Sequence, residues 1–537
     1  MYKYMEACRE NLASKLRTSV NPEARPILNV KNMGISNDFL KALELSYNAA
    51  TLRKRNKQPQ ETSNAVTIIE EKLSVLFKKV KGKTDSTETS FNDIISLATS
   101  YCNMGIAYKD FTSKTKLVVA RSHLKKCLEL LNGKELDRRA ILIIMRASVQ
   151  LEHVFRQLNE AENCCLFSHK AIGFYLEYTS QGSEFPAPIV SRFSVNLDIE
   201  DKVWPNTMLS LVTLYSELLP HIEKCERDKW DPETLVKPIH NFFMNQWSDA
   251  LASRRKGCAW AFATLDFSNY FTRHFRLLDT LNYLYAIDYI LDTYREHVCN
   301  ISTATVSSII DFVDLEGRFA IEWGLFCKHC LFVWKSKLFF RNNGKGRRAN
   351  KSKSKTSIES VFSTTLIYTN VKEHVKNDVS ELPVSVQNLT DVLTFYGYCT
   401  QYFKKAKQYF AITNDKNQIA VIYSLEIDAA KYIPYFIPDR DKQLQYYKQR
   451  IGCFTHMKSS IKSVDLNIYD IIFIKKKFEL IRIYGIILDM ILEDAEVTEK
   501  RFEDIDTEVP NYMKNSVECI KMYVEMLDKL VLLGKKE

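Results

Sequence analysis

The fold is decided by residues 259–294, AWAFATLDFSNYFTRHFRLLDTLNYLYAIDYILDTY, a stretch that contains neither glycine nor proline. Apolar residues recur at the spacing of an α-helix in both of its halves. They are Trp260, Ala263, Phe267, Tyr270 and Phe271 in the first half and Leu277, Leu281, Leu284, Ile287 and Leu291 in the second. The polar residues Thr272 to His274 mark a turn, so the stretch predicts a helical hairpin. Because such a hairpin has apolar surface on both sides, it needs a neighbour on each flank, and we predict a stacked helical array.

The composition favours helices along the whole chain. Only 15 of the 537 residues are glycine and 13 are proline, while 46% are hydrophobic and 12% aromatic. Ordinary usage is about 7% for glycine and 5% for proline, so long uninterrupted helices are favoured over strands and turns. The N-terminal residues are charged throughout, and no window of about 18 residues is free of charge and apolar. We therefore expect a cytoplasmic protein without membrane insertion.

The pattern of helical windows and breaks divides the chain into four predicted regions. These are an N-terminal helical cap at 1–95, N-terminal repeats at 96–340, a basic flexible linker at 341–357 and C-terminal helical repeats at 358–537. Within the cap, residues 53–64 are polar and predict a loop. The first repeat is expected at residues 101–131, with Gly105 as a small packing residue. The second is expected at residues 138–178, with Ala161 and Ala171 in close contacts.

The net charge of +10 is concentrated in one segment. Nine basic residues follow one another with no Asp or Glu before Glu359. They are Lys335, Lys337, Arg341, Lys345, Arg347, Arg348, Lys351, Lys353 and Lys355. A nucleic-acid-binding domain usually gathers its basic residues on a folded face with base-stacking residues among them. The segment is more typical of a solvated linker, and we expect no nucleic-acid partner.

The 13 cysteines are scattered through apolar windows, as Cys127 and Cys399 are, so we expect buried free thiols. The cluster Cys327-Lys328-His329-Cys330 suggests half of a zinc site, but no second ligand pair follows it. Neighbouring side chains on a helix also point in different directions, so Cys330 and His329 are poorly placed for nucleophilic catalysis.

No phosphate-binding loop, zinc-protease motif, nucleophile elbow or dinucleotide fingerprint occurs in the chain. We expect no enzyme activity, no cofactor and no metal, and we look for function in the polar faces of helices. Two helices carry polar residues at positions i, i+3 and i+7. These residues are Ser210, Thr213 and Glu217 after Trp204, and Asp266, Asn269 and Arg273 after Trp260. They are either solvated faces or a partner-binding surface on the concave side of the array.

Several segments, in order along the chain, resemble the KIF-binding protein family. They are Trp260-Ala261, Tyr270-Phe271 and Ala286, residues 395–410 and 446–457, and Val464-Asp465-Leu466-Asn467 followed by Tyr469. The resemblance covers roughly residues 100–525. It is specific as an ordered set of segments, although none of them is a catalytic signature.

This resemblance implies an all-α fold, a right-handed α-solenoid of tetratricopeptide-like helical hairpins in two halves joined by a linker. It also implies a cytoplasmic, cytoskeleton-associated protein that binds kinesin motor domains and blocks their attachment to microtubules, with effects on microtubule organisation and axonal transport. The two polar helices would then line the motor-binding surface. We expect the chain to act as a monomer. The alternative is a general helical-repeat scaffold in a ubiquitin-ligase or chaperone assembly.

Overall fold

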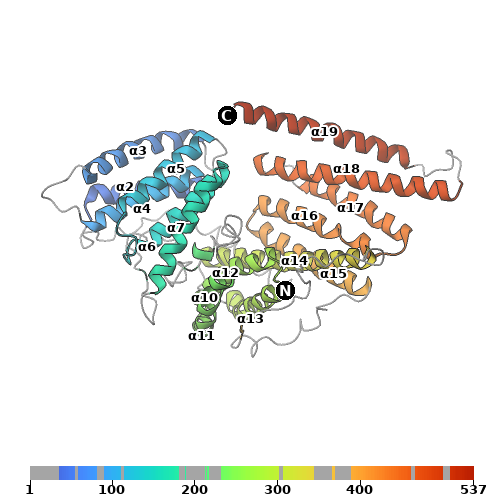
Figure 1. Cartoon of the computed structure of the whole chain (residues 1–537), viewed down its shortest axis with the longest axis horizontal. Helices are drawn as coiled ribbons and strands as arrows, with labels where there is room; N and C mark the ends of the chain where they lie inside the picture. Colours follow the sequence, from blue (N-terminus) through green and yellow to red (C-terminus); the bar gives the residue numbers. More distant parts are fainter. Residues whose placement is uncertain are drawn as a thin grey trace, which may run out of the picture. The chain divides into compact units, whose positions relative to one another are not determined.

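The computed structural model describes residues 35–54, 59–81, 90–109, 114–180, 188, 212, 214–216, 232–300, 306–343, 366–368, 389–460, 466–499 and 508–536. Every regular element among these residues is a helix, and none of them forms a strand. The chain divides into two compact units, which meet inside one helix between Phe267 and Ser268. Figure 1 shows the helices with their labels.

The unit before Ser268 contains the first helices of the chain. They are α2 (Asn37–Lys54), α3 (Pro59–Lys81), α4 (Phe91–Lys109), α5 (Lys114–Leu130), α6 (Ile141–Gln157), α7 (Ala161–Ser180), α10 (Pro232–Asn245), α11 (Trp247–Ala252) and most of α12 (Arg254–Arg273). Helices α2 to α7 share one hydrophobic core. A Cβ built on Gly105 of α4 would lie 2.4 Å from Cγ of Leu124 on α5, which confirms Gly105 as a close-packing position.

The unit from Ser268 onward contains the end of α12 and the remaining helices. They are α13 (Leu277–Asn300), α14 (Val306–Asn343), α15 (Leu389–Ile412), α16 (Lys416–Ala430), the short 3-10 helix η3 (Ile433–Phe436), α17 (Arg440–Ser460), α18 (Leu466–Val497) and α19 (Val509–Lys536). From α13 to α19, consecutive helices pack against one another. Helices α18 and α19, drawn in red, lie side by side (Figure 1).

The turn between α12 and α13 is closed by backbone hydrogen bonds. The N–H of Arg276 donates to the carbonyl of Phe271 at 2.9 Å, and Phe275 adopts a left-handed φ of 58°. This pairing ends a helix and reverses the chain. Next to the turn, the rings of Phe271 and Tyr283 stack at 5.8 Å. The structure thus confirms the predicted hairpin, with α12 ending at Arg273 and α13 beginning at Leu277.

Two glycines bring α14 and α15 close together. A Cβ on Gly324 would lie 2.4 Å from Cε1 of Phe403, and a Cβ on Gly317 would lie 2.9 Å from Cε2 of Phe410. Both phenylalanines are buried, at 0% and 2% exposure. The absent side chains of α14 therefore make room for two aromatic rings of α15.

Three expectations about local structure are wrong. Residues 53–64 do not form a loop throughout, because α2 extends to Lys54 and α3 begins at Pro59. Proline suits the first position of a helix, where its missing N–H is not needed. Ala161 is exposed, whereas Ala171 is fully buried. The expectation of free thiols holds for nine cysteines of the described residues. It is wrong for Cys165, which is disulfide-bonded.

The packing of consecutive helices in each unit makes the fold an all-α helical solenoid. Its right-handed sense and the four predicted domain boundaries stay predictions. Most of the predicted linker, from residue 344 onward, lies outside the described residues. Within the described part of the chain, no helix combines the length and the apolar character that crossing a membrane requires.

Candidate functional site

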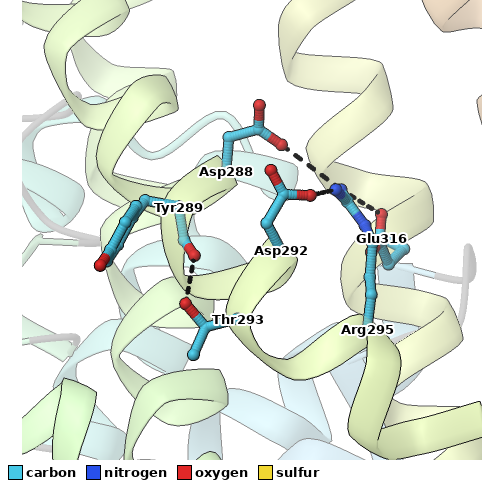
Figure 2. Close-up of polar contacts among 6 residues, drawn as sticks. All are labelled: Asp288, Tyr289, Asp292, Thr293, Arg295 and Glu316. Atoms are coloured by element: carbon cyan, nitrogen blue, oxygen red, sulfur yellow. Dashed lines mark hydrogen bonds and ion pairs between the residues drawn. The ribbon is translucent and has the colours of Figure 1, made fainter. Parts of the chain in front are cut away.

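A cluster of carboxylates surrounds Arg295 between α13 and α14 (Figure 2). The guanidinium donates from Nε to Glu316 Oε1 at 2.6 Å and from NH2 to Glu316 Oε2 at 3.2 Å. Its NH2 lies 3.4 Å from Oδ1 of Asp288, and its NH1 pairs with Asp292. Three carboxylates from two helices therefore share one guanidinium, an arrangement called the Arg295 cluster below.

The Arg295 cluster follows from the two faces of α13. Asp288, Asp292 and Arg295 stand at i, i+4 and i+7, so they lie on one side of the helix. Ile287 and Ile290 are fully buried on the other side. The helix therefore packs through its apolar side and turns its charged side toward Glu316 of α14 and toward solvent.

Exposure differs strongly among the carboxylates of this cluster. The side chain of Glu316 is 2% exposed, that of Asp288 30% and that of Asp292 62%. Burial works against the charged form of Arg295, but Glu316 and Asp288 outweigh it and raise the pKa of the guanidinium. Burial raises the pKa of Asp288, although Arg295 opposes this shift. Asp292 thus offers the most accessible negative charge of the cluster.

A further cation lies near the cluster, on α15. Burial lowers the pKa of Lys405, and the charge of Asp288 partly offsets this effect. The ammonium group of Lys405 also lies 4.7 Å from the ring centre of Tyr402. Even with Lys405 included, three carboxylates face two cations. The Arg295 cluster therefore carries an excess of negative charge, which suits a cationic partner.

The three predicted site residues of α12 have different environments. Asp266 and Arg273 are exposed, whereas Asn269 is half-buried. The side-chain amide of Asn269 donates to Oε1 of Glu322 on α14 at 2.5 Å. Asn269 and Glu322 both belong to the unit from Ser268 onward, and Glu322 is 6% exposed, so this bond ties the last turns of α12 to the interior of that unit. The three residues share one helix, but Asn269 already has an acceptor within the chain.

The other three predicted site residues, Ser210, Thr213 and Glu217, lie outside the described residues. Their described neighbour Tyr215 is fully buried, and its ring stacks on Tyr175 at 3.9 Å. The proposed pairing of the two polar helices on one concave surface therefore stays a prediction.

Comparison with known proteins places this chain in a family. A family model described as "KIF-1 binding protein C terminal" matches residues 258–536, which is more than half of the chain. The chain belongs to the KIF-1 binding protein family. No curated protein and no solved structure matches it.

The region that the KIF-1 binding protein family model matches begins at Cys258, near the start of α12, and ends at the last residue of α19. It includes Asp266, Asn269 and Arg273 as well as the whole Arg295 cluster. It also includes every quoted segment that carries the resemblance in the sequence. The family assignment thus rests on the same part of the chain that holds the described predicted site residues and the Arg295 cluster.

Sequence reasoning missed the Arg295 cluster for an identifiable reason. The apolar periodicity of residues 277–291 describes only the buried side of α13. The charged spacing of Asp288, Asp292 and Arg295 was a second signal in the same helix. Glu316 left no such signal, because its pairing joins residues on different helices.

The Cys327-Lys328-His329-Cys330 segment lies inside α14. Cys327 and Cys330 are buried, and burial raises the pKa of both thiols. His329 places Nδ1 2.7 Å from the carbonyl oxygen of Leu325, one turn earlier in the same helix. Among the described residues, no group of three His, Cys, Asp or Glu side chains is placed to hold a metal ion. The two buried thiols contribute to the packing of α14.

Proposed function

We propose that this protein binds kinesin motor domains and prevents their attachment to microtubules. The observation that carries the proposal is membership of the KIF-1 binding protein family over residues 258–536. Through this activity the protein would regulate microtubule organisation and kinesin-dependent transport, including axonal transport. It would act in the cytoplasm, in association with the cytoskeleton, as a monomeric binding protein and not as an enzyme.

The charges on α12, α13 and α14 support this proposal. A motor that attaches to acidic tubulin needs a basic face, so a competitor for that face should offer carboxylates. Asp292 is 62% exposed at the edge of the Arg295 cluster, and Asp266 is exposed on α12. Both lie within the region that the family model matches. We propose these two carboxylates as contacts for basic residues of the motor.

Co-sedimentation tests the proposal directly. A purified kinesin motor domain is bound to stabilised microtubules and pelleted with increasing amounts of this protein. The expected result is that the motor moves into the supernatant, and that raising the salt concentration weakens this release, because screening reduces attraction between exposed charges. A motor that stays on the microtubules at a large excess of the protein would contradict the proposed function.

A further inference from the structure

The last helix carries an apolar stripe on its exposed side. Met513, Val517, Ile520 and Val524 of α19 are 56%, 50%, 44% and 49% exposed. Their successive spacings are four, three and four residues, so they lie in one narrow row along the helix. We call this row the α19 stripe. Single exposed apolar residues are ordinary, but a contiguous exposed row marks an interaction surface.

The α19 stripe is separate from the core of its own unit. The buried side of α19 packs on α18 through Cys519, which is 5% exposed, with Tyr512 and Met522 beside it. At one border of the stripe, the ring of Tyr523 lies 5.7 Å from that of Phe478 on α18, and Phe478 is itself 49% exposed. The apolar surface thus continues from α19 onto α18.

The other border of the stripe is basic. Lys514 and Lys521 stand three residues before Val517 and Val524, so each is a surface neighbour of a stripe residue. Both lysines are exposed, and neither forms an ion pair with another residue that the structure describes. These two cations therefore remain available to a partner.

We propose that the α19 stripe binds an amphipathic α-helix of another protein, with carboxylates along one side of its apolar row. The four-three spacing is the one by which two helices interlock their side chains, and the free lysines would pair with the partner's carboxylates. An anionic membrane fits less well, because Glu518 and Glu525 lie just beyond the lysines and would face the head groups. A second copy of the chain would bring its own lysines to the same border.

A peptide-binding experiment on the full chain tests this proposal. The probe is a fluorescent helical peptide of about four heptads with Val and Leu in its apolar row and Glu beside it. A matched peptide has Lys in place of each Glu. We expect the Glu peptide to bind about tenfold more tightly than the Lys peptide, because the latter opposes two lysines. Equal affinities for the two peptides would overturn the proposed partner chemistry.

Variants locate the peptide on the surface. Val517→Glu with Ile520→Glu should abolish binding, whereas Val497→Glu, at a residue of α18 that is 84% exposed, should leave it unchanged. Lys514→Glu with Lys521→Glu alters no apolar residue, and it should reverse the preference to the Lys peptide. Binding that survives all these changes would place the peptide elsewhere and overturn the proposal.

Two further measurements test the alternative partners of the stripe, a second copy of the chain and an anionic membrane. Sedimentation velocity over a range of concentrations tests for a second copy. We expect no self-association through the stripe, that is, none that the Val517→Glu and Ile520→Glu substitutions would remove. Flotation with vesicles of phosphatidylserine and phosphatidylcholine should recover no protein. Dimerisation through the stripe, or vesicle binding that the same substitutions abolish, would assign the surface to a second copy or to a membrane and overturn the proposal. Release of kinesin motors from microtubules is measured separately, because the α19 stripe does not depend on the function proposed above.

Discussion

Arg295 of α13 and Glu316 of α14 form a bidentate ion pair. Nε of Arg295 lies 2.6 Å from Oε1 of Glu316, and NH2 lies 3.2 Å from Oε2. Glu316 is 2% exposed, so the guanidinium supplies the positive charge that its buried carboxylate requires. This geometry joins two consecutive helices, and it holds the guanidinium beside Asp292, with which it also pairs.

Removing the guanidinium should therefore destabilise the protein strongly. We expect Arg295→Met to lower the free energy of unfolding by about 3 kcal/mol, because it leaves a buried carboxylate without its partner. Arg318→Met is the matched control. Arg318 pairs with Asp314, but the side chains are 47% and 33% exposed, so the loss should stay below about 1 kcal/mol. Urea unfolding followed by circular dichroism measures both, and similar losses in the two variants would contradict the assigned burial of the pair.

Charge reversal of the exposed carboxylates should weaken motor release. Asp266→Lys with Asp292→Lys places two positive charges before the basic face of a motor, and we expect an affinity about a hundredfold lower. The control is Asp489→Lys with Glu496→Lys, which makes the same change in charge at two other exposed positions, both on α18. Co-sedimentation of the motor with microtubules measures release by each variant. If the double variant releases the motor as well as the control does, the motor contacts other residues.

Acidification should destabilise the fold through His329. Burial lowers its pKa from 6.5 to about 4, although the nearby Leu325 carbonyl opposes the shift. The unfolded chain then binds a proton below pH 6.5, while the folded chain does so only near pH 4. The free energy of unfolding therefore falls as the pH falls through this window, by up to about 3 kcal/mol. The loss between pH 7 and pH 4.5 should be smaller in His329→Gln, and an identical pH profile for both proteins would refute this role.

Two glycines should respond oppositely to alanine. Gly105→Ala would place its methyl group only 2.4 Å from Cγ of Leu124, so we expect a loss of about 1 to 3 kcal/mol from overpacking. A Cβ on Gly173 of α7 meets no atom within 4 Å. Gly173→Ala should therefore stabilise the helix by up to about 1 kcal/mol. Thermal unfolding of the two variants gives the comparison, and a neutral or stabilising Gly105→Ala would show that Leu124 can move aside.

The helices themselves could be predicted from the sequence, because apolar spacing and the scarcity of glycine act locally. The apolar spacing of residues 389–412 predicts one helix, and α15 has these bounds. The sequence likewise predicts one helix at about 232–253, but the structure divides it into α10 and α11, which Gln246 separates. The predicted loop at 53–64 failed because α2 and α3 extend into it from both ends, which leaves at most residues 55–58 between them.

The candidate site could be predicted only in part. The exposure of Asp266 and Arg273 follows from helical spacing, and the structure agrees with it. The bond from Asn269 to Glu322 and the pairing of Arg295 with Glu316 depend on how neighbouring helices are aligned. No local pattern encodes that alignment, so the roles of Asn269 and Glu316 emerge only from the three-dimensional structure.

The glycines of α14 also determine how that helix can move. Gly317 and Gly324 are seven residues apart, and so are Phe410 and Phe403, which lie against them. If α15 slid along α14, its rings would meet the bulkier neighbours of each glycine, and a ring would reach the next glycine only after about 10 Å. The interface therefore has no intermediate position of low energy. A force applied to one helix would displace the pair as a rigid body, so any bending of the solenoid must occur at other interfaces.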